Sequence, residues 1–287
     1  MEFRPTRYDV VPTVVKNLLI INVLLFLATI VIGRTGTDIS EYLALHHWYS
    51  DKFQIWQLIT HMFMHGNVSG PMPDYEGGVM HLFSNMFALW MFGSLLENYF
   101  GPKRFLSFYL LCGMGAALFH LGVLTYEFGI IKDAIAEFQA NPTYKQYSIW
   151  LSQSHISPGS EFGQALHSLK LEWMNSPMDD SFVSRAGERL QLYYSGMVDQ
   201  ATVGASGAVF GILFGFGYLF PNTLIYLYFF FPMKAKYFIA LYALFELYAG
   251  VRNSAGDNIA HFAHLGGMVI AFIILKIWQR SNSKTRF

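Results

Sequence analysis

Six apolar segments, separated by polar or turn-rich connections, constrain the fold of this sequence more than any other feature. They cover approximately residues 18–32, 79–100, 105–126, 204–220, 237–251 and 259–278. About 20 apolar residues are enough to cross a bilayer as a helix. Only 13% of the 287 residues are charged, against about 25% in soluble domains. The sequence therefore predicts an all-α membrane protein, a bundle of six transmembrane helices with long loop inserts.

The positions of lysine and arginine indicate how the helices are oriented. Of the 19 basic residues, 11 lie near the chain ends or in the turns at 101–104 and 232–236, namely Arg4, Arg7, Lys16, Lys103, Arg104, Lys234, Lys236, Lys276, Arg280, Lys284 and Arg286. The two shorter connections on the other side hold Arg34, Lys52 and Arg252. Because positive residues favour the cytoplasmic side, we expect a cytoplasmic N-terminus (1–16), a membrane domain (17–278) and a cytoplasmic tail (279–287). The membrane we expect is a bacterial plasma membrane.

Three further segments leave alternatives or need interpretation. The segment at 18–32 lacks a clear small-residue cleavage site, which favours an uncleaved first span over a signal peptide. The connection at 127–203 is polar and interrupted by prolines, but its apolar residues recur at helical spacing. It predicts short amphipathic helices outside the cytoplasm, lying on the membrane or on each other. The aromatic strip at 225–231 is either an interfacial re-entry or an extension of the preceding span.

Small residues form matching stripes in two of the apolar segments. They recur every fourth position, as Gly207, Gly211 and Gly215 in one segment and as Ala263, Gly267 and Ala271 in the other. Such stripes allow two membrane helices to approach closely. Ser206 opens the first segment and His264 lies early in the second, so packing of the stripes would bring a serine within reach of an imidazole. A serine among small residues more often has only a packing role.

Two more polar residues, His81 and Asn85, lie one turn apart at the start of the segment at 79–100. With the orientation above, His81, Ser206 and His264 lie at the same depth near the outer face. Polar residues in membrane spans usually face the protein interior and mark functional sites. The alternative is a pair that only satisfies neighbouring backbone groups.

Other chemistries have less support. His61 and His65 are spaced like the metal ligands of HExxH, but the glutamate is absent. A histidine-lined metal site or transporter that also uses His46, His47 and His81 would lack a carboxylate in the spans to support ion coupling. A net charge of zero gives no sign of a nucleic-acid partner. The lone Cys112 excludes an intramolecular disulfide and is interpreted as a small core residue.

Taken together, these residues resemble the rhomboid family of intramembrane serine proteases. Ser206 lies in Gly204-Ala205-Ser206-Gly207, which is similar to the family's GxSG, and His264 begins a sequence similar to HxxGxxxG, with alanine for the last glycine. His81 and Asn85 match HxxxN, and Glu97 to Gly101 match ExxxG. The resemblance covers approximately residues 50–125 and 201–278.

The resemblance implies a role for each of these residues. Ser206 would be the nucleophile and His264 its general base, forming a dyad without an aspartate, and His261 is the rival base. The side chains of His81 and Asn85 and the backbone N–H of Ser206 would form the oxyanion hole. Gly204, Gly207, Gly211 and Gly267 would be helix-packing residues.

The implied partners are transmembrane protein substrates, whose helices unwind locally to be cut, and the lipid bilayer, with no metal and no cofactor. The alternative is a catalytically silent protein of the same fold that binds client transmembrane helices. Two positions depart from the family pattern. Gln57 stands where the family often has arginine after tryptophan, and Phe210 where it often has a tyrosine that stacks on the histidine.

Overall fold

The computed structural model describes residues 9–66, 73–154, 156–227, 230–252 and 260–284. Helices make up most of it: α1 (Thr13–Gly33), α2 (Ser40–Leu43), α3 (Gln57–Thr60), the 3-10 turn η1 (His61–Phe63), α4 (Tyr75–Ala88), the π-helical turn η2 (Leu89–Gly93), α5 (Ser94–Phe100), α6 (Pro102–Ala140), α7 (Tyr144–Gln153), α8 (Glu161–Asn175), α9 (Ser181–Val198), α10 (Ser206–Leu219), α11 (Ala235–Arg252) and α12 (His261–Lys284). The predicted helical membrane protein is confirmed in this coarse form.

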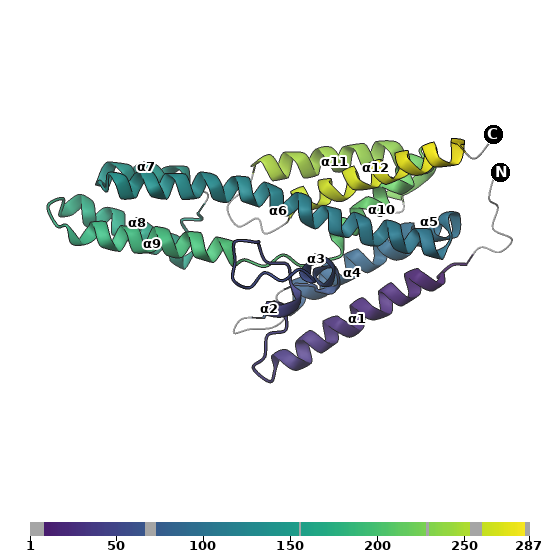
Figure 1. Ribbon diagram of the computed structural model, residues 1–287, viewed down its shortest axis with the longest axis horizontal. Helices are drawn as coiled ribbons and strands as arrows, with labels where there is room; N and C mark the ends of the chain where they lie inside the picture. The colour runs from purple at the N-terminus through teal and green to yellow at the C-terminus, as the bar shows by residue number, and fades with distance from the viewer. Residues whose placement is uncertain (1–8, 67–72, 155, 228–229, 253–259, 285–287) are drawn as a thin grey trace.

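Within the described residues, four helical segments are long and apolar enough to cross a membrane: Thr13–Gly33, Tyr75–Phe100, Pro102–Ala140 and His261–Ser281. Two of the six predicted spans are not among them. α10 is apolar but has only 14 residues, about 21 Å of helix, and α11 carries Lys236, Glu246 and Arg252. The count of six spans therefore stays a prediction. In Figure 1, α1 begins and α12 ends at the same end of the molecule.

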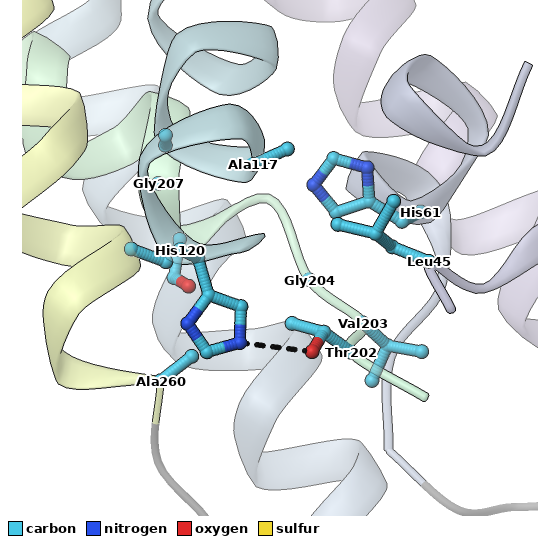
Figure 2. Close-up of a pocket in the computed structure, with 12 residues that line it drawn as sticks. Leu45, His61, Ala117, His120, Thr202, Val203, Gly204, Gly207 and Ala260 are labelled. Carbon is cyan, nitrogen blue, oxygen red and sulfur yellow. Dashed lines mark hydrogen bonds between the residues drawn. The ribbon is translucent and has the colours of Figure 1, made fainter. Parts of the chain in front are cut away.

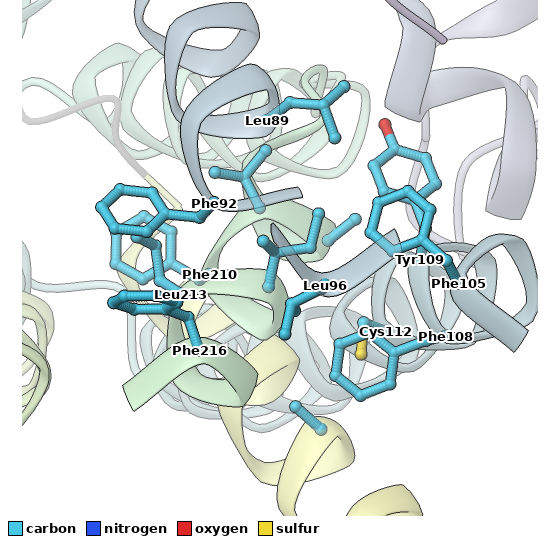
Figure 3. Packing of buried hydrophobic residues seen from close by; sticks show 14 of the residues in the cluster. Leu89, Phe92, Leu96, Phe105, Phe108, Tyr109, Cys112, Phe210, Leu213 and Phe216 are labelled. Carbon is cyan, nitrogen blue, oxygen red and sulfur yellow. The ribbon is translucent and has the colours of Figure 1, made fainter. Parts of the chain in front are cut away.

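The membrane core is centred on α6, α10 and α12, and each of these helices packs against the other two. Large side chains from α4 to α6 and from α10 fill its interior (Figure 3), among them Leu96, Phe108, Phe210 and Phe216. Cys112 is fully buried in this core, which confirms the interpretation of it as a core residue. Burial of apolar side chains against each other leaves only the outer faces of these helices for lipid.

The small-residue stripes lie where α10 meets its neighbours. A Cβ on Gly267 would lie 1.9 Å from the carbonyl oxygen of Gly207, and one on Gly211 would lie 2.7 Å from Cys112. These three glycines are therefore needed for close approach. Gly204 precedes α10, in a loop, with φ of 123°.

Glu97 attaches α1 to the rest of the core. The N-cap residue of α1, Pro12, has no side-chain hydrogen bond, and the carboxylate of Glu97 accepts the N–H groups of Val14 and Val15 at 2.9 and 2.8 Å. A negative charge at a helix N-terminus satisfies free N–H groups and stabilises the helix dipole. The glutamate of the ExxxG pattern thus has a structural role here.

The region at 127–203 folds on itself as a second helical unit. α6 does not end at the predicted edge of the membrane but continues to Ala140. Its extension packs with α7, α8 and α9 around a separate core that includes Phe138, Tyr147, Trp150 and Trp173. Of the two predicted arrangements, helices lying on each other is the one observed (Figure 1).

The aromatic strip at 225–231 is not an extension of the preceding helix, whereas the interfacial re-entry stays a prediction. It contributes to a two-stranded antiparallel hairpin of β1 (Leu224–Leu227) and β2 (Phe231–Lys234), with Leu224 opposite Lys234. β-branched and aromatic residues favour extended structure, and Pro221 and Asn222 stop α10 before the strip. The hairpin returns the chain to the start of α11.

Candidate active site

Ser206 is the first residue of α10, and its hydroxyl faces the imidazole of His264. The Oγ atom of Ser206 lies 2.8 Å from Nε2 of His264. His264 lies one turn into α12, and the close contact of Gly207 with Gly267 holds the two helix starts together. The structure thus brings together the two side chains that the small-residue stripes predicted to meet. A serine hydrogen-bonded to an imidazole is the arrangement that activates a hydroxyl nucleophile.

Phe210 fixes the plane of the imidazole. It lies one turn after Ser206 on α10, and its ring stacks on that of His264 with centroids 4.1 Å apart and planes at 4°. Tyr242 packs against the ring of Phe210. Phenylalanine therefore supplies the stacking surface at the position where tyrosine was expected.

A third side chain completes this arrangement, and the sequence reasoning missed it. Oε2 of Glu246, on α11, lies 2.8 Å from Nδ1 of His264 and 2.7 Å from Nδ1 of His261. The expectation that the spans hold no useful carboxylate overlooked Glu246, which is 3% exposed. A single glutamate in the apolar segment at 237–251 was the available signal, because ionisable residues inside a membrane are seldom without function.

The loop at 199–205, which precedes Ser206, is called the serine loop here. His81 lies beside this loop, next to Gly204. A Cβ on Gly204 would lie 2.8 Å from Nε2 of His81, so only glycine allows the imidazole to approach the loop this closely. The ring of His65 packs edge-on against that of His81, with centroids 5.2 Å apart. The amide nitrogen of Asn85 donates to the carbonyl of His81 within α4, at 2.9 Å.

A small cavity of about 20 Å³ lies beside Ser206 (Figure 2). It is lined by residues from the first loop (the connection after α1, described at 34–66), from α6, from the serine loop and from the segment at the start of α12. Among them are His61, His120 and Thr202. His120 Nε2 lies 3.2 Å from the hydroxyl of Thr202. One water needs about 10–15 Å³ of such volume and polar partners, so the cavity has room for a single water next to the hydroxyl.

Two histidines of the first loop, His61 and His65, contact other groups. Nδ1 of His61 bonds to the carbonyl of Gln57 at 2.7 Å, and His65 packs on His81. Burial lowers the pKa of His61 to about 4 and that of His65 to about 3, so both are neutral at pH 7. In the described part of the chain, the group of three or more possible ligands is Glu246, His261 and His264.

Comparison with known proteins decides the family. The model of the rhomboid domain matches residues 52–129 and 182–280, which together cover more than half of the chain. This chain belongs to the rhomboid family. It is 26% identical, over 79% of its length, to an uncharacterized mitochondrial rhomboid protein of Schizosaccharomyces pombe, and 24% identical, over 82%, to a mitochondrial RHOMBOID-like protein 12 of Arabidopsis thaliana. The chain spans about half the length of these relatives, 52% and 56%.

The first loop of this rhomboid is anchored by Gln57, where the family often has arginine. The side-chain oxygen of Gln57 accepts the N–H groups of His46 and Gln54, and its nitrogen donates to the carbonyls of Lys52 and Tyr42. Gln57 is fully buried. An amide can both donate and accept, so one neutral side chain ties the loop together.

The family match stops where the helical unit of α7 and α8 begins. The unmatched residues 130–181 include the end of α6, all of α7 and all of α8. The serine loop follows directly after α9, and its Thr202 pairs with Leu45 of the first loop in an antiparallel bridge. Residues 130–181 therefore lie outside the matched rhomboid domain, whereas α9, which shares a core with α7 and α8, lies inside it.

Proposed function

We propose that this rhomboid is an intramembrane serine endopeptidase that cleaves peptide bonds in or near the transmembrane segments of other membrane proteins. The hydrogen bond between Ser206 Oγ and His264 Nε2, at the mouth of a membrane core, supports this proposal most strongly. A packing serine has no need of an imidazole that is itself oriented by a stacked ring and a carboxylate.

In the proposed reaction, His264 Nε2 takes the hydroxyl proton of Ser206 while Oγ attacks the carbonyl carbon of the substrate. The tetrahedral oxyanion is stabilised by the N–H of Ser206, at a helix start, and by the side chains of His81 and Asn85. Collapse of the intermediate breaks the C–N bond, and His264 returns the proton to the leaving amine. A water, activated by His264, then hydrolyses the acyl-enzyme and restores Ser206.

The second candidate is a catalytically silent protein that binds client transmembrane helices. It is less favoured because Ser206, His264, His81 and Asn85 are all present.

The membrane in which the protein resides is a separate question. Both relatives carry mitochondrial names, which gives the expected bacterial plasma membrane no support, and the cytoplasmic placement of both termini stays a prediction.

The deciding experiment compares Ser206→Ala and His264→Ala with wild type on a purified single-span substrate, with the product ends sequenced. Each substitution alone should abolish detectable cleavage, and the double variant should be no worse, because groups that act as a unit are not additive. A serine-reactive fluorophosphonate should label wild type but not Ser206→Ala. Cleavage that persists in Ser206→Ala would rule out the proposed mechanism, and binding of the substrate without cleavage by wild type would favour the silent alternative.

A further inference from the structure

Glu246 is a buried carboxylate in an apolar helix, held between two histidines of α12. Placing a charge in a membrane core is costly unless it is paired, and Glu246 is paired with two ring nitrogens. His261 and His264 both direct Nδ1 to the same oxygen, Oε2. The carboxylate belongs to α11 and is held in position by two side chains of α12.

This geometry determines which nitrogen of His264 carries the proton. An ionised carboxylate only accepts hydrogen bonds, so Nδ1 of His264 must bear the hydrogen. In the neutral ring the other nitrogen, Nε2, then has a free lone pair. That lone pair faces Ser206 Oγ at 2.8 Å. Glu246 thus holds His264 in the tautomer that can accept the serine proton.

We propose that Glu246 is a positioning residue that makes the pair of Ser206 and His264 a serine–histidine–glutamate triad. The inference rests on the proposed protease function and deepens it. When His264 takes the proton of Ser206, the imidazolium gains a negative partner 2.8 Å away, in a setting of low dielectric where such a pair interacts strongly. Glu246 stays ionised while the proton moves from Ser206 to His264 and on to the leaving amine.

His261 acts one step further from the reaction. It shares the carboxylate oxygen with His264, and its ring lies edge-on to that of His264 with centroids 6.3 Å apart. We infer that His261 holds the side chain of Glu246 in place. His264, and not His261, then acts as the general base.

Other titratable groups face this cluster from each neighbouring helix. They are His81 on α4, His120 on α6, Tyr242 on α11 and His261 on α12. Glu246 supplies the negative charge within this set, since the others are neutral or cationic near pH 7. Glu246 is therefore the member of this set that can stabilise a positive charge on His264.

The experiment measures kcat and KM of Glu246→Gln on the single-span substrate across pH. Glutamine keeps the size of the side chain and removes its charge. We expect kcat to fall by about 10²-fold or more, with KM changed less than about twofold. The acidic limb of kcat/KM, which reports protonation of the free base, should move to lower pH by about one unit or more. Glu246→Asp keeps the charge and should retain the wild-type acidic limb even if its kcat is reduced.

Glu97→Gln is the matched control. Glu97 is also a buried glutamate in an apolar helix, but its carboxylate accepts backbone N–H groups of α1. This variant should lower the Tm and leave the acidic limb unmoved, which separates loss of a structural carboxylate from loss of the triad. If Glu246→Gln does not fold, the same limb measured on Glu246→Asp and the pH dependence of fluorophosphonate labelling of wild type still test the inference.

Each outcome points one way. Activity in Ser206→Ala would refute the protease itself. No cleavage in Ser206→Ala, together with unchanged kcat and acidic limb in Glu246→Gln, would refute only the role of Glu246. The atoms of Glu246, His261 and His264 also lie close enough to hold a metal ion. Loss of wild-type cleavage in phenanthroline, restored by zinc, would replace the triad with a metal site.

Discussion

At the scale of single residues, two neighbouring side chains, Ser84 and Asn85, donate hydrogen bonds to the same backbone carbonyl near Ser206. The amide of Asn85 donates to the carbonyl of His81, and so does the hydroxyl of Ser84, at 2.9 and 3.0 Å. Asn85 is buried whereas Ser84 is exposed. An amide has two N–H donors, so Asn85 can hold His81 with one and serve an oxyanion with the other.

Asn85→Ala should therefore lower kcat by about 10²–10³-fold with little change in KM, because the donor is used only when negative charge develops. Steady-state kinetics on the single-span substrate measure this. Ser84→Ala is the control, since it removes a hydrogen bond to the same carbonyl without removing a donor near Ser206. Equal losses in both variants would show that the support of His81, and not an oxyanion donor, is what matters.

Individual site residues could be predicted to different degrees. Ser206 and His264 were found because small residues at every fourth position place them on facing helix surfaces, and such spacing is visible in one sequence. Glu246 was not found because no motif marks it. Its partners lie 15 and 18 residues later in the chain, and only the packing of α11 on α12 shows that one carboxylate meets two rings.

At the scale of helices, the approach of α10 and α12 sets the distance between the serine and the imidazole. The closest point is the contact of Gly267 with the carbonyl of Gly207. Helices at such a contact cannot accept a methyl group without moving apart, because interiors are close-packed and overfilling costs about 1–3 kcal/mol.

Gly267→Ala should accordingly lower the Tm and reduce kcat together, by displacing His264 from Ser206. Gly122→Ala is the control within α6, where an added Cβ meets nothing within 4 Å, and it should leave activity unchanged. Differential scanning fluorimetry in detergent and the cleavage assay measure the two effects. A Gly267→Ala enzyme with wild-type kcat would show that the stripe is not what aligns the two side chains.

The ends of helices were predicted less well than their existence. Hydropathy falls after about residue 126, but this fall marks where the chain would leave the membrane and not where the helix stops. The apolar residues at 128–138 keep helical spacing, so α6 continues to Ala140 and packs Phe128, Ile135 and Phe138 against other partners. The hairpin at 224–234 was missed because a short aromatic strip is compatible with helix and strand alike.

At the scale of the whole molecule, the helical unit of α7, α8 and α9 and the chain ends should lie on opposite sides of the membrane. Ser168 is an exposed position on α8, and Ser283 lies near the C-terminal end of α12. In a Cys112→Ser background, a membrane-impermeant thiol reagent added to intact cells should label Ser168→Cys and not Ser283→Cys, as the bias in basic residues requires.

Permeabilised cells provide the control, because both cysteines should then react. The reverse pattern in intact cells would overturn the orientation, and with it the placement of Ser206 near the outer face. The same measurement tests the proposed cytoplasmic placement of the C-terminal tail.

The continuity of α6 has a mechanical consequence for the whole protein. Its 39 residues make a rod of about 58 Å, nearly twice the hydrocarbon thickness of a bilayer. One half carries Ala116, against which Gly207 packs, and the other half carries Phe138 in the core that it shares with α7, α8 and α9. α6 is one uninterrupted α-helix with no proline after Pro102. A displacement of the unit formed by α7, α8 and α9 is therefore transmitted along α6 to the helix that begins with Ser206.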